Sequence, residues 1–208
     1  MLRAIEERPA IDEAAALRAM FRARKQVFID LLQWDLPALA GEFEVDQFDD
    51  QDAEYLILRG RDGEHRASAR LLRTDRPHLL GDLYPHLCAG PVPSGPRIRK
   101  ITRFCLDRHQ RAIERRGARN QLVTALADYA LENGISAYTG VADLDWFNQI
   151  QRFGWACEPL GQPVRHDSRW LTGLHIAIEL ETVERLRRDG VYAELTYALA
   201  MPVTGGVQ

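Results

Sequence analysis

The order of helix and strand patterns constrains this chain more than any other feature of its sequence. A helical pattern over residues 12–33 is followed by two strand patterns, over 53–60 and 66–73. An Asp-Gly pair between the two strands is a hairpin signal. Strand and helix patterns alternate over the rest of the chain. This order predicts a mixed α/β fold, with one sheet flanked by helices.

The alternating half of the chain is predicted from its apolar spacing and its capping residues. We expect strands over 98–106, 135–142 and 174–180, and helices over 117–133, 143–153 and from Thr182 onward. We expect loops over 35–52 and 75–97, a short helix around 83–87, and a frayed tail over 202–208. Helix caps are expected at Asp12 and Asp143.

Bulk properties exclude several classes of protein. A length of 208 residues suits one domain, here 1–208, and a net charge of −3 gives no argument for nucleic acid. No apolar run approaches the roughly 18 residues that a membrane helix needs. The three cysteines are odd in number and far apart, which favours reduced thiols in the cytoplasm. The six histidines lack metal-ligand spacing, so no metal is expected, and the oligomeric state is not determined.

Charged and aromatic side chains gather around an acidic segment, residues 44–49, which reads Glu-Val-Asp-Gln-Phe-Asp. The side chains of interest are Arg24, Phe28, Trp34, Glu44, Asp46, Asp49, Arg70 and Arg103. Arginine forks hold carboxylates, and aromatic faces stack on bases or cover a sulfonium. The set therefore predicts a pocket for a small charged molecule, with the acidic segment serving that pocket rather than the stability of the fold. A solvated loop, structural ion pairs and simple core packing of the two aromatics are the alternatives.

The ordered set resembles the acyl-homoserine lactone synthases, which make the autoinducers of bacterial quorum sensing. The matching motifs are E-x-D-x-x-D at residues 44–49, S-x-R-L at 68–71 and Arg-Phe at 103–104. The resemblance runs from about residue 18 to 163. It implies a GNAT-type acyltransferase fold.

The resemblance also implies a reaction of two substrates. An acyl thioester, carried by acyl carrier protein or coenzyme A, acylates the amine of S-adenosylmethionine (SAM). The methionine carboxylate then closes the lactone ring and expels methylthioadenosine (MTA). No further cofactor is implied. The resemblance assigns the SAM side to Arg24, Phe28, Trp34, Asp46, Asp49 and Arg70.

Two residues depart from the family pattern: Tyr84 stands for a Phe, and Lys100 stands for the Glu usually assigned as general base. With Lys100 charged, four cations face three carboxylates, which is the wrong sign for cationic SAM. Lys100 either points away, or is deprotonated by burial and serves as the base, or partners Glu44 while Glu44 serves as the base. We favour the last arrangement. The catalytic candidates are therefore Glu44, Lys100 and Arg103.

The donor side is predicted in the arginine-rich segment 107–120, which precedes the helix whose N-terminus would face cofactor phosphates. Its arginines suit the phosphates of coenzyme A or the acidic face of a carrier protein, and a solvated basic loop is the alternative. The donor-side candidates are Thr102, Phe104, Arg108, Arg111, Arg115, Arg116, Val141, Ala142 and Trp146. Ala142 stands near a position where the family often has Thr, and it favours an unsubstituted acyl chain.

Two other functions stay open at the level of sequence because of Lys100. One is acylation of a different amine on the same fold. The other is a catalytically inactive protein that binds a ligand or a partner.

Overall fold

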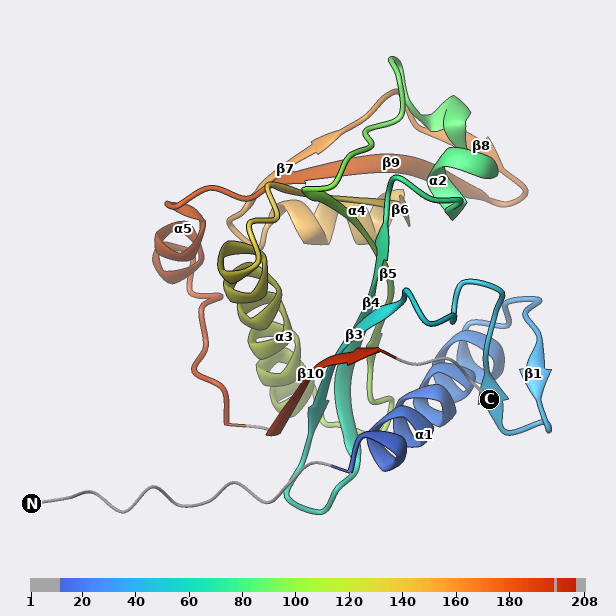
Figure 1. The fold of residues 1–208 in the computed structure, drawn as a ribbon, viewed down its shortest axis with the longest axis vertical. Coiled ribbons are helices and arrows are strands. Elements are labelled where there is room, and N and C mark those ends of the chain that lie inside the picture. Colours follow the sequence, from blue (N-terminus) through green and yellow to red (C-terminus); the bar gives the residue numbers. More distant parts are fainter. Residues whose placement is uncertain (1–11, 197, 205–208) are drawn as a thin grey trace, which may run out of the picture.

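A computed structural model describes residues 12–196 and 198–204. In this part of the chain an eight-stranded sheet runs in the order β10-β3-β4-β5-β6-β9-β7, with β8 paired to β9. Helix α1 (Glu13–Arg24) covers one face of the β3–β5 half and helix α3 (Ala112–Glu132) covers the other (Figure 1). The predicted class, a single mixed sheet flanked by helices, is confirmed.

The N-terminal helix begins where predicted and then changes its winding. The carboxylate of Asp12 caps α1 by accepting the N–H of Ala15 at 3.0 Å. Beyond Arg24 the chain continues as a π-helix, Lys25–Leu31, so the predicted single helix over 12–33 consists of two segments. Such π segments occur often at functional sites, and this one carries Phe28.

The next elements follow the hairpin prediction closely. Strands β3 (Glu54–Arg59) and β4 (His65–Arg73) pair antiparallel, and Gly63 in their turn has a φ of 81°. The expected loops contain short elements: β1 (Ala38–Leu39), β2 (Phe43–Glu44), α2 (Leu79–Asp82) and the 3₁₀ turn Pro85–Leu87. Strand β5 (Ile98–Leu106) has the predicted bounds.

Helix α3 begins at Ala112, earlier than the predicted residue 117. The side chain of Glu114 accepts the N–H of Arg111 at 2.9 Å and so satisfies one of the free donors at the helix start. The helix ends before Gly134, whose φ is 65°. Then follow β6 (Ala137–Asp143) and α4 (Leu144–Gln151), which Asp143 caps by accepting the N–H of Trp146 at 2.8 Å, as predicted.

The C-terminal elements differ most from the prediction. The strand predicted over 174–180 is β9 (Arg169–Ala177), and two short strands before it, β7 (Ala156–Pro159) and β8 (Val164–His166), were not predicted. Helix α5 (Thr182–Arg188) begins where expected. Residues 202–204 belong to strand β10 (Ala198–Thr204), which pairs with β3, so the prediction of fraying is wrong there. Residues 205–208 lie outside the described residues.

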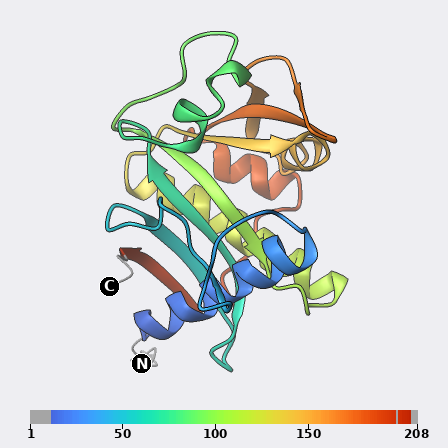
Figure 2. The ribbon, with the colours of Figure 1, turned by 90° about the vertical axis from the view of Figure 1, so that its right-hand side faces the viewer.

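The two halves of the sheet meet at a short parallel contact. Residues Ile98–Lys100 of β5 pair with Ala137–Thr139 of β6, and the strands then diverge. Figure 2 shows β5 running steeply down the molecule while β6 runs across its top. A bulge in β5 lies beyond the contact, because the register against β4 shifts between Ser68 and Arg70. The divergence and the bulge together open the space in which the site lies.

Each face of the sheet has its own core. One core joins Leu71 and Tyr138 of the sheet with Leu122 of α3, and the other joins Ile57 of the sheet with Met20 of α1. Within the described ranges, no helix has both the length and the apolar character needed to cross a bilayer.

Candidate active site

Three arginines and three carboxylates form one buried ion-pair cluster between α1, the acidic segment and the sheet. Its members are Arg24 of α1, Glu44, Asp46 and Asp49 of the acidic segment, Arg70 of β4 and Arg103 of β5. No side chain in the cluster is more than 9% exposed. The structure thus brings together the six charged residues that the sequence had placed in one pocket.

Arg24 anchors the helical side of the cluster. Its Nε donates to Oε2 of Glu44 at 2.5 Å, and its two terminal nitrogens donate to the two oxygens of Asp49 at 2.8 Å each. The hydroxyl of Tyr55 also donates to Asp49, at 2.7 Å. Burial by itself would lower the pKa of Arg24, but the two carboxylates raise it above its ordinary value. Arg24 is therefore a permanent cation that ties the helix to the acidic segment.

The two strand arginines complete the cluster by sharing the same carboxylates. Arg70 donates to both oxygens of Asp46, at 2.6 and 3.0 Å, and lies 2.6 Å from Oδ1 of Asp49. Arg103 donates to Oε1 of Glu44 at 2.9 Å and to Oδ2 of Asp46 at 2.7 Å. Each carboxylate therefore lies between two guanidinium groups.

The acceptor capacity of the two aspartates is used within the protein. Besides its arginines, Asp49 accepts the hydroxyl of Tyr55 and the N–H of Asp46, and Asp46 accepts the N–H of Phe48. Burial by itself would raise the pKa of both aspartates, but the bound arginines lower it by more. Both pKa values therefore lie below their ordinary values. The expected pairing with arginines is present, but the expected free lone pairs for a substrate amine are not found among the described contacts. The acidic segment thus has a structural role, and its predicted part in the SAM site stays a prediction.

Arg103 connects the cluster to a neighbouring cavity. It lies at the bulge of β5 with a φ of 52°, a left-handed conformation that is uncommon for a residue other than glycine. Its guanidinium carbon lies 5.5 Å from the ring centroid of Phe28, and Phe28 stacks on Trp34 with 4.9 Å between centroids. One side chain thus takes part in the ion-pair cluster and in the wall of the cavity.

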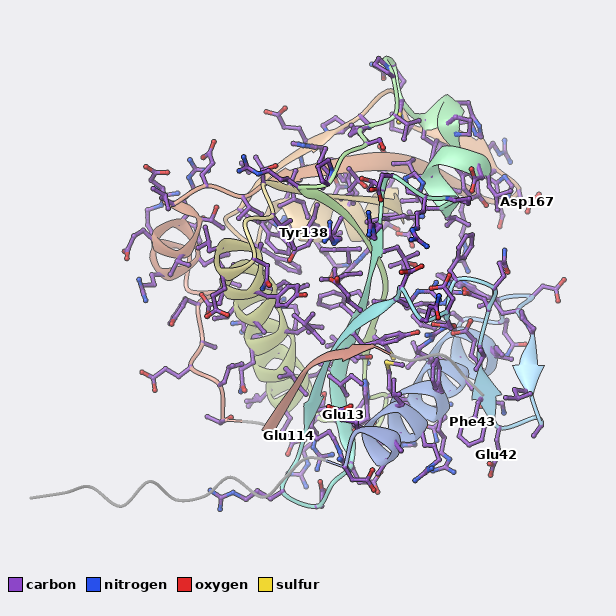
Figure 3. All side chains as sticks on the ribbon, in the orientation of Figure 1. Glu13, Glu42, Phe43, Glu114, Tyr138 and Asp167 are labelled. Carbon is purple, nitrogen blue, oxygen red and sulfur yellow. The ribbon has the colours of Figure 1, made fainter. Side chains whose placement is uncertain are left out.

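The cavity has a volume of about 790 Å³ and lies where β5 and β6 diverge. It reaches from the π-helix to the turn between β8 and β9, where Asp167 marks the rim (Figure 3). Nine of the predicted site residues line it: Phe28, Trp34, Thr102, Arg103, Phe104, Arg115, Val141, Ala142 and Trp146. This volume is in the range of small-molecule sites.

One arm of the cavity is walled by aromatic rings. Phe104 and Trp146 have ring centroids 5.4 Å apart, and Trp146 lies 5.9 Å from Phe153. Phe153 and Trp155 also line the cavity, and the sequence had not singled them out as donor-side residues. Their positions on either side of the helix-ending Gly154 could have drawn attention to them. This arm can take up an apolar chain.

The donor-side arginines are only partly gathered at the cavity. Arg115 lines it, whereas Arg108, Arg111 and Arg116 are exposed and lie outside the lining. Arg108 donates to the carbonyl of Gln26 at 3.3 Å. Because α3 begins at Ala112, Arg115 and Arg116 lie in its first turns and not in a preceding loop.

Lys100 is the predicted catalytic residue that forms no ion pair with the cluster. It is 1% exposed, and its Nζ has no hydrogen-bond partner among the described residues. Burial, and then the charges of Arg70 and Arg103, lower the pKa of Lys100 to about 7. The predicted pairing of Lys100 with Glu44 is wrong, because the oxygens of Glu44 are held by Arg24 and Arg103. At neutral pH, Lys100 is therefore partly deprotonated, and its neutral form carries a free lone pair.

A mixed sheet whose parallel strands diverge around an apolar cavity is the arrangement of the GNAT fold. A protein of Lactobacillus plantarum described as a "putative N-acetyltransferase" shares this fold with a TM-score of 0.55 and 17% sequence identity, over 83% of this chain and 94% of that one. The sequence is more specific. Residues 10–186 match the family described as "Autoinducer synthase", and the chain belongs to that family of acyltransferases, the enzymes of quorum-sensing signal synthesis.

Named relatives and solved structures agree with this assignment. The chain is 30% identical to an isovaleryl-homoserine lactone synthase of Bradyrhizobium diazoefficiens, over 82% of this chain and 76% of the relative. It is 34% identical to an acyl-homoserine-lactone synthase of Ralstonia nicotianae, over 71% and 74%. The structure of BjaI, a CoA-dependent acyl-homoserine lactone synthase, with SAM and isopentyl-CoA superposes with a TM-score of 0.76 at 27% identity, over 88% and 85%. TofI, in a ternary complex with an inhibitor and MTA, gives 0.71 at 29% identity, over 84% and 90%.

Replacing Asp49 by asparagine should destabilise the protein strongly. The change leaves Arg24 and Arg70 buried with less compensating charge, which costs roughly 3–5 kcal/mol when one partner of a buried ion pair is removed. Urea unfolding measures the loss. Glu42→Gln is the matched control, because Glu42 is an exposed acid whose ion pair with Arg22 spans 3.7 Å at the surface. A loss below about 1 kcal/mol for Asp49→Asn would contradict the structural role of the cluster.

Replacing Lys100 by methionine should stabilise the protein at neutral pH. Lysine is protonated in the unfolded chain up to its ordinary pKa of 10.5 but only to about 7 in the fold, so the unfolded state binds more protons between these values. We expect Lys100→Met to be more stable by roughly 1–4 kcal/mol at pH 7. The difference should shrink as the pH rises toward 10.5, since the native protein then gains stability. Paired urea titrations from pH 6.5 to 10 test this, and a difference that does not change with pH contradicts it.

Proposed function

We propose that this protein makes an acyl-homoserine lactone from SAM and an acyl-coenzyme A thioester, and releases MTA. The observation that carries the proposal is the single cavity that joins an aromatic and cationic end, at Phe28, Trp34 and Arg103, to an apolar arm at Phe104 and Trp146. Two related structures support it, since BjaI was solved with SAM and isopentyl-CoA and TofI with an inhibitor and MTA.

At the first end, the protein offers the groups that SAM needs. The stacked rings of Phe28 and Trp34 provide faces for the sulfonium or the adenine. The guanidinium of Arg103 is held rigid by Glu44 and Asp46, and it suits the methionine carboxylate. Arg24, Arg70, Asp46 and Asp49 act in this proposal by holding Arg103 and the acidic segment in place.

At the other end, the acyl chain occupies the aromatic arm between β5 and β6, with Val141 and Ala142 along β6. The family often has Thr near this position when the acyl chain bears a 3-oxo group, so Ala142 favours an unsubstituted chain. The register between β5 and β4 shifts near Arg103, and we propose that a backbone N–H of this bulge holds the thioester carbonyl. Thr102 lines the same wall.

Coenzyme A is the donor that the arginines favour. Arg115 lines the cavity, with exposed Arg111 and Arg116 beside it at the start of the 21-residue helix α3. An acyl carrier protein is the alternative donor, since its acidic surface would meet the same arginines. As proposed, the reaction uses only its two substrates, without metal or further cofactor, nucleic acid or membrane partner. It takes place in the reducing cytoplasm, in keeping with the three free cysteines.

The native protein, incubated with SAM and a panel of branched and straight-chain acyl-CoA thioesters, should release MTA and a lactone in equal amounts. Mass spectrometry of both products measures the reaction, and S-adenosylhomocysteine, which lacks the sulfonium, is the control. Consumption of thioester without MTA would favour acylation of a different amine. Binding of SAM without any turnover would favour an inactive binding protein.

Replacing Arg111, Arg115 and Arg116 by glutamate should weaken the binding of the acyl-CoA thioester more than the binding of SAM. The change puts negative charge beside the phosphates of coenzyme A, so we expect the KM for acyl-CoA to rise by about tenfold or more while the KM for SAM changes less than about twofold. The effect should shrink at high salt, because exposed charges are screened. Reversal of Arg185, Arg187 and Arg188 in α5 changes the net charge equally and is the matched control. Equal effects on both substrates would contradict the donor-site assignment.

A further inference from the structure

Three of the buried polar atoms that have no hydrogen-bond partner among the described residues are brought together around Lys100. They are Nζ of Lys100, Nε2 of His78 and Oγ1 of Thr139. Lys100 and Thr139 are directly paired across β5 and β6, and the charge of Lys100 contributes to lowering the pKa of His78, after burial. Buried polar atoms are rarely left unpaired in native proteins, so such a group indicates a place for a ligand.

The position of Lys100 adjoins the cavity. Thr102 lies two residues further along β5, on the same face of the strand, and lines the cavity. Leu79, which follows His78, lines it as well. On this face, Lys100 and Thr102 pair with Leu72 and Arg70 of β4, so the lysine points toward the ion-pair cluster and not toward α3. Its flexible four-carbon stem needs to move its amine only a short way to meet a ligand in the cavity.

The surrounding charges decide which proton acceptor can work here. The charged and titratable groups that act on Lys100 or border it are Arg70 of β4, Arg103 of β5, Asp46 of the acidic segment, Asp82 of α2, and His78. Neighbouring arginines favour the ionised form of a carboxylate and so make it a weak base. Burial and the same arginines disfavour the protonated form of an amine, so a fraction of Lys100 is neutral near pH 7 and can accept a proton.

A neutral lysine also removes the electrostatic conflict with the substrate. Three guanidinium groups then face three carboxylates, and the cluster carries no net charge. A cationic substrate meets a neutral site instead of a positive one.

We propose that Lys100 is a catalytic residue of this enzyme and accepts the proton of the substrate ammonium group, the task for which this position carries a glutamate in the family pattern. This inference rests on the proposed function. His78 and Thr139 are the neighbours that can hydrogen-bond the lysine amine once it has taken up the proton.

The proton and bond changes balance without any further reactant. The ammonium group of SAM gives one proton to the lone pair of Lys100 Nζ and becomes a neutral amine. The amine attacks the thioester carbonyl, the new C–N bond forms, and the C–S bond breaks. The second proton of the nitrogen goes to the departing thiolate, which leaves as the thiol. Lys100 then returns its proton to solvent. The α-amino group of SAM, with an ordinary pKa of about 7.7–8.0, is close enough to Lys100 for this transfer to be nearly balanced.

The test is the single-turnover rate of acylation of SAM by an acyl-CoA thioester, measured from pH 6 to 9. We expect the native rate to rise with pH and to show a break near 7. Lys100→Met should lower the rate at saturating SAM by about 100-fold or more and abolish this break, with the KM for SAM within about threefold of native. Lys100→Arg should be as inactive as Lys100→Met, because an arginine is not deprotonated in proteins. Small primary amines should restore part of the rate to Lys100→Ala.

Arg99→Met is the matched control. Arg99 is the neighbour of Lys100 on β5, and its Nε lies 3.6 Å from Glu54. We expect Arg99→Met to keep the native rate and pH profile. MTA binding and thermal melting check that each variant is folded.

Three outcomes would overturn the inference. If Lys100→Arg keeps the native rate, Lys100 acts as a cation that holds the substrate carboxylate. If Lys100→Met keeps the rate and the break, the lysine has no part in catalysis. If the native protein forms no lactone from SAM with any thioester, the proposed function itself fails, and this inference with it.

Discussion

The sharing of each buried carboxylate between two arginines is the interaction on which the rest of the structure depends. Isolated buried charges are costly, and even a buried ion pair can fail to offset its desolvation. Here Arg24, Arg70 and Arg103 bring three fixed cations from α1, β4 and β5, and the acidic segment supplies the three anions between them. The segment contains little regular structure of its own, so the cluster fixes its path. Through Arg103 the same contacts determine the shape of the cavity wall.

The balanced charges of this cluster explain how position 100 can carry a lysine where the family pattern has a glutamate. Its charges are balanced internally, so a group beside it feels two nearby guanidinium charges that are already committed to carboxylates. Lys100 is buried at the edge of a network that has no acceptor to offer it. In such a place an amine loses its proton instead of forming an ion pair. A residue that looks like a charge reversal in the sequence is therefore close to a neutral residue in the fold.

Much of the fold could be predicted because local signals agreed with it. Asp12 and Asp143 cap their helices, and the bounds of β5 were correct. The start of α3 was predicted at residue 117 because the cap that Glu114 provides for a start at Ala112 was not recognised. Strand β10 was missed because Pro202 argues against a central strand, yet β10 is an edge strand with an irregularity at that point.

The sequence predicted that the six charged residues lie together, but not which of them bind one another and which border the cavity. The family pattern identified the six charged residues, because motif spacing records which side chains must meet. It could not show that the acceptor capacity of Asp46 and Asp49 is filled within the protein, because that also depends on Tyr55 and on backbone N–H groups that have no sequence signature. Nor could it show that Lys100 is isolated from Glu44, because burial and distance across strands are properties of the packed sheet. The arginines of segment 107–120 do not all reach the cavity. Because α3 begins at Ala112, Arg115 and Arg116 are neighbours on a helix, and of these two Arg115 lines the cavity.

The left-handed backbone of Arg103 limits how this protein can change. Glycine would relieve the backbone conformation but would remove two anion contacts and the cation over Phe28 together. Asparagine tolerates the same conformation, but its side chain is too short to span both Glu44 and Asp46. Lysine would keep the charge without the planar fork. The residue at position 103 must therefore fit a left-handed backbone, bind the buried carboxylates and form part of the cavity wall. Few other residues meet all three requirements, so few substitutions are expected to be tolerated there. Substitutions that change substrate specificity should be tolerated better in the apolar arm around Trp146, where the side chains line the cavity without also holding buried charges.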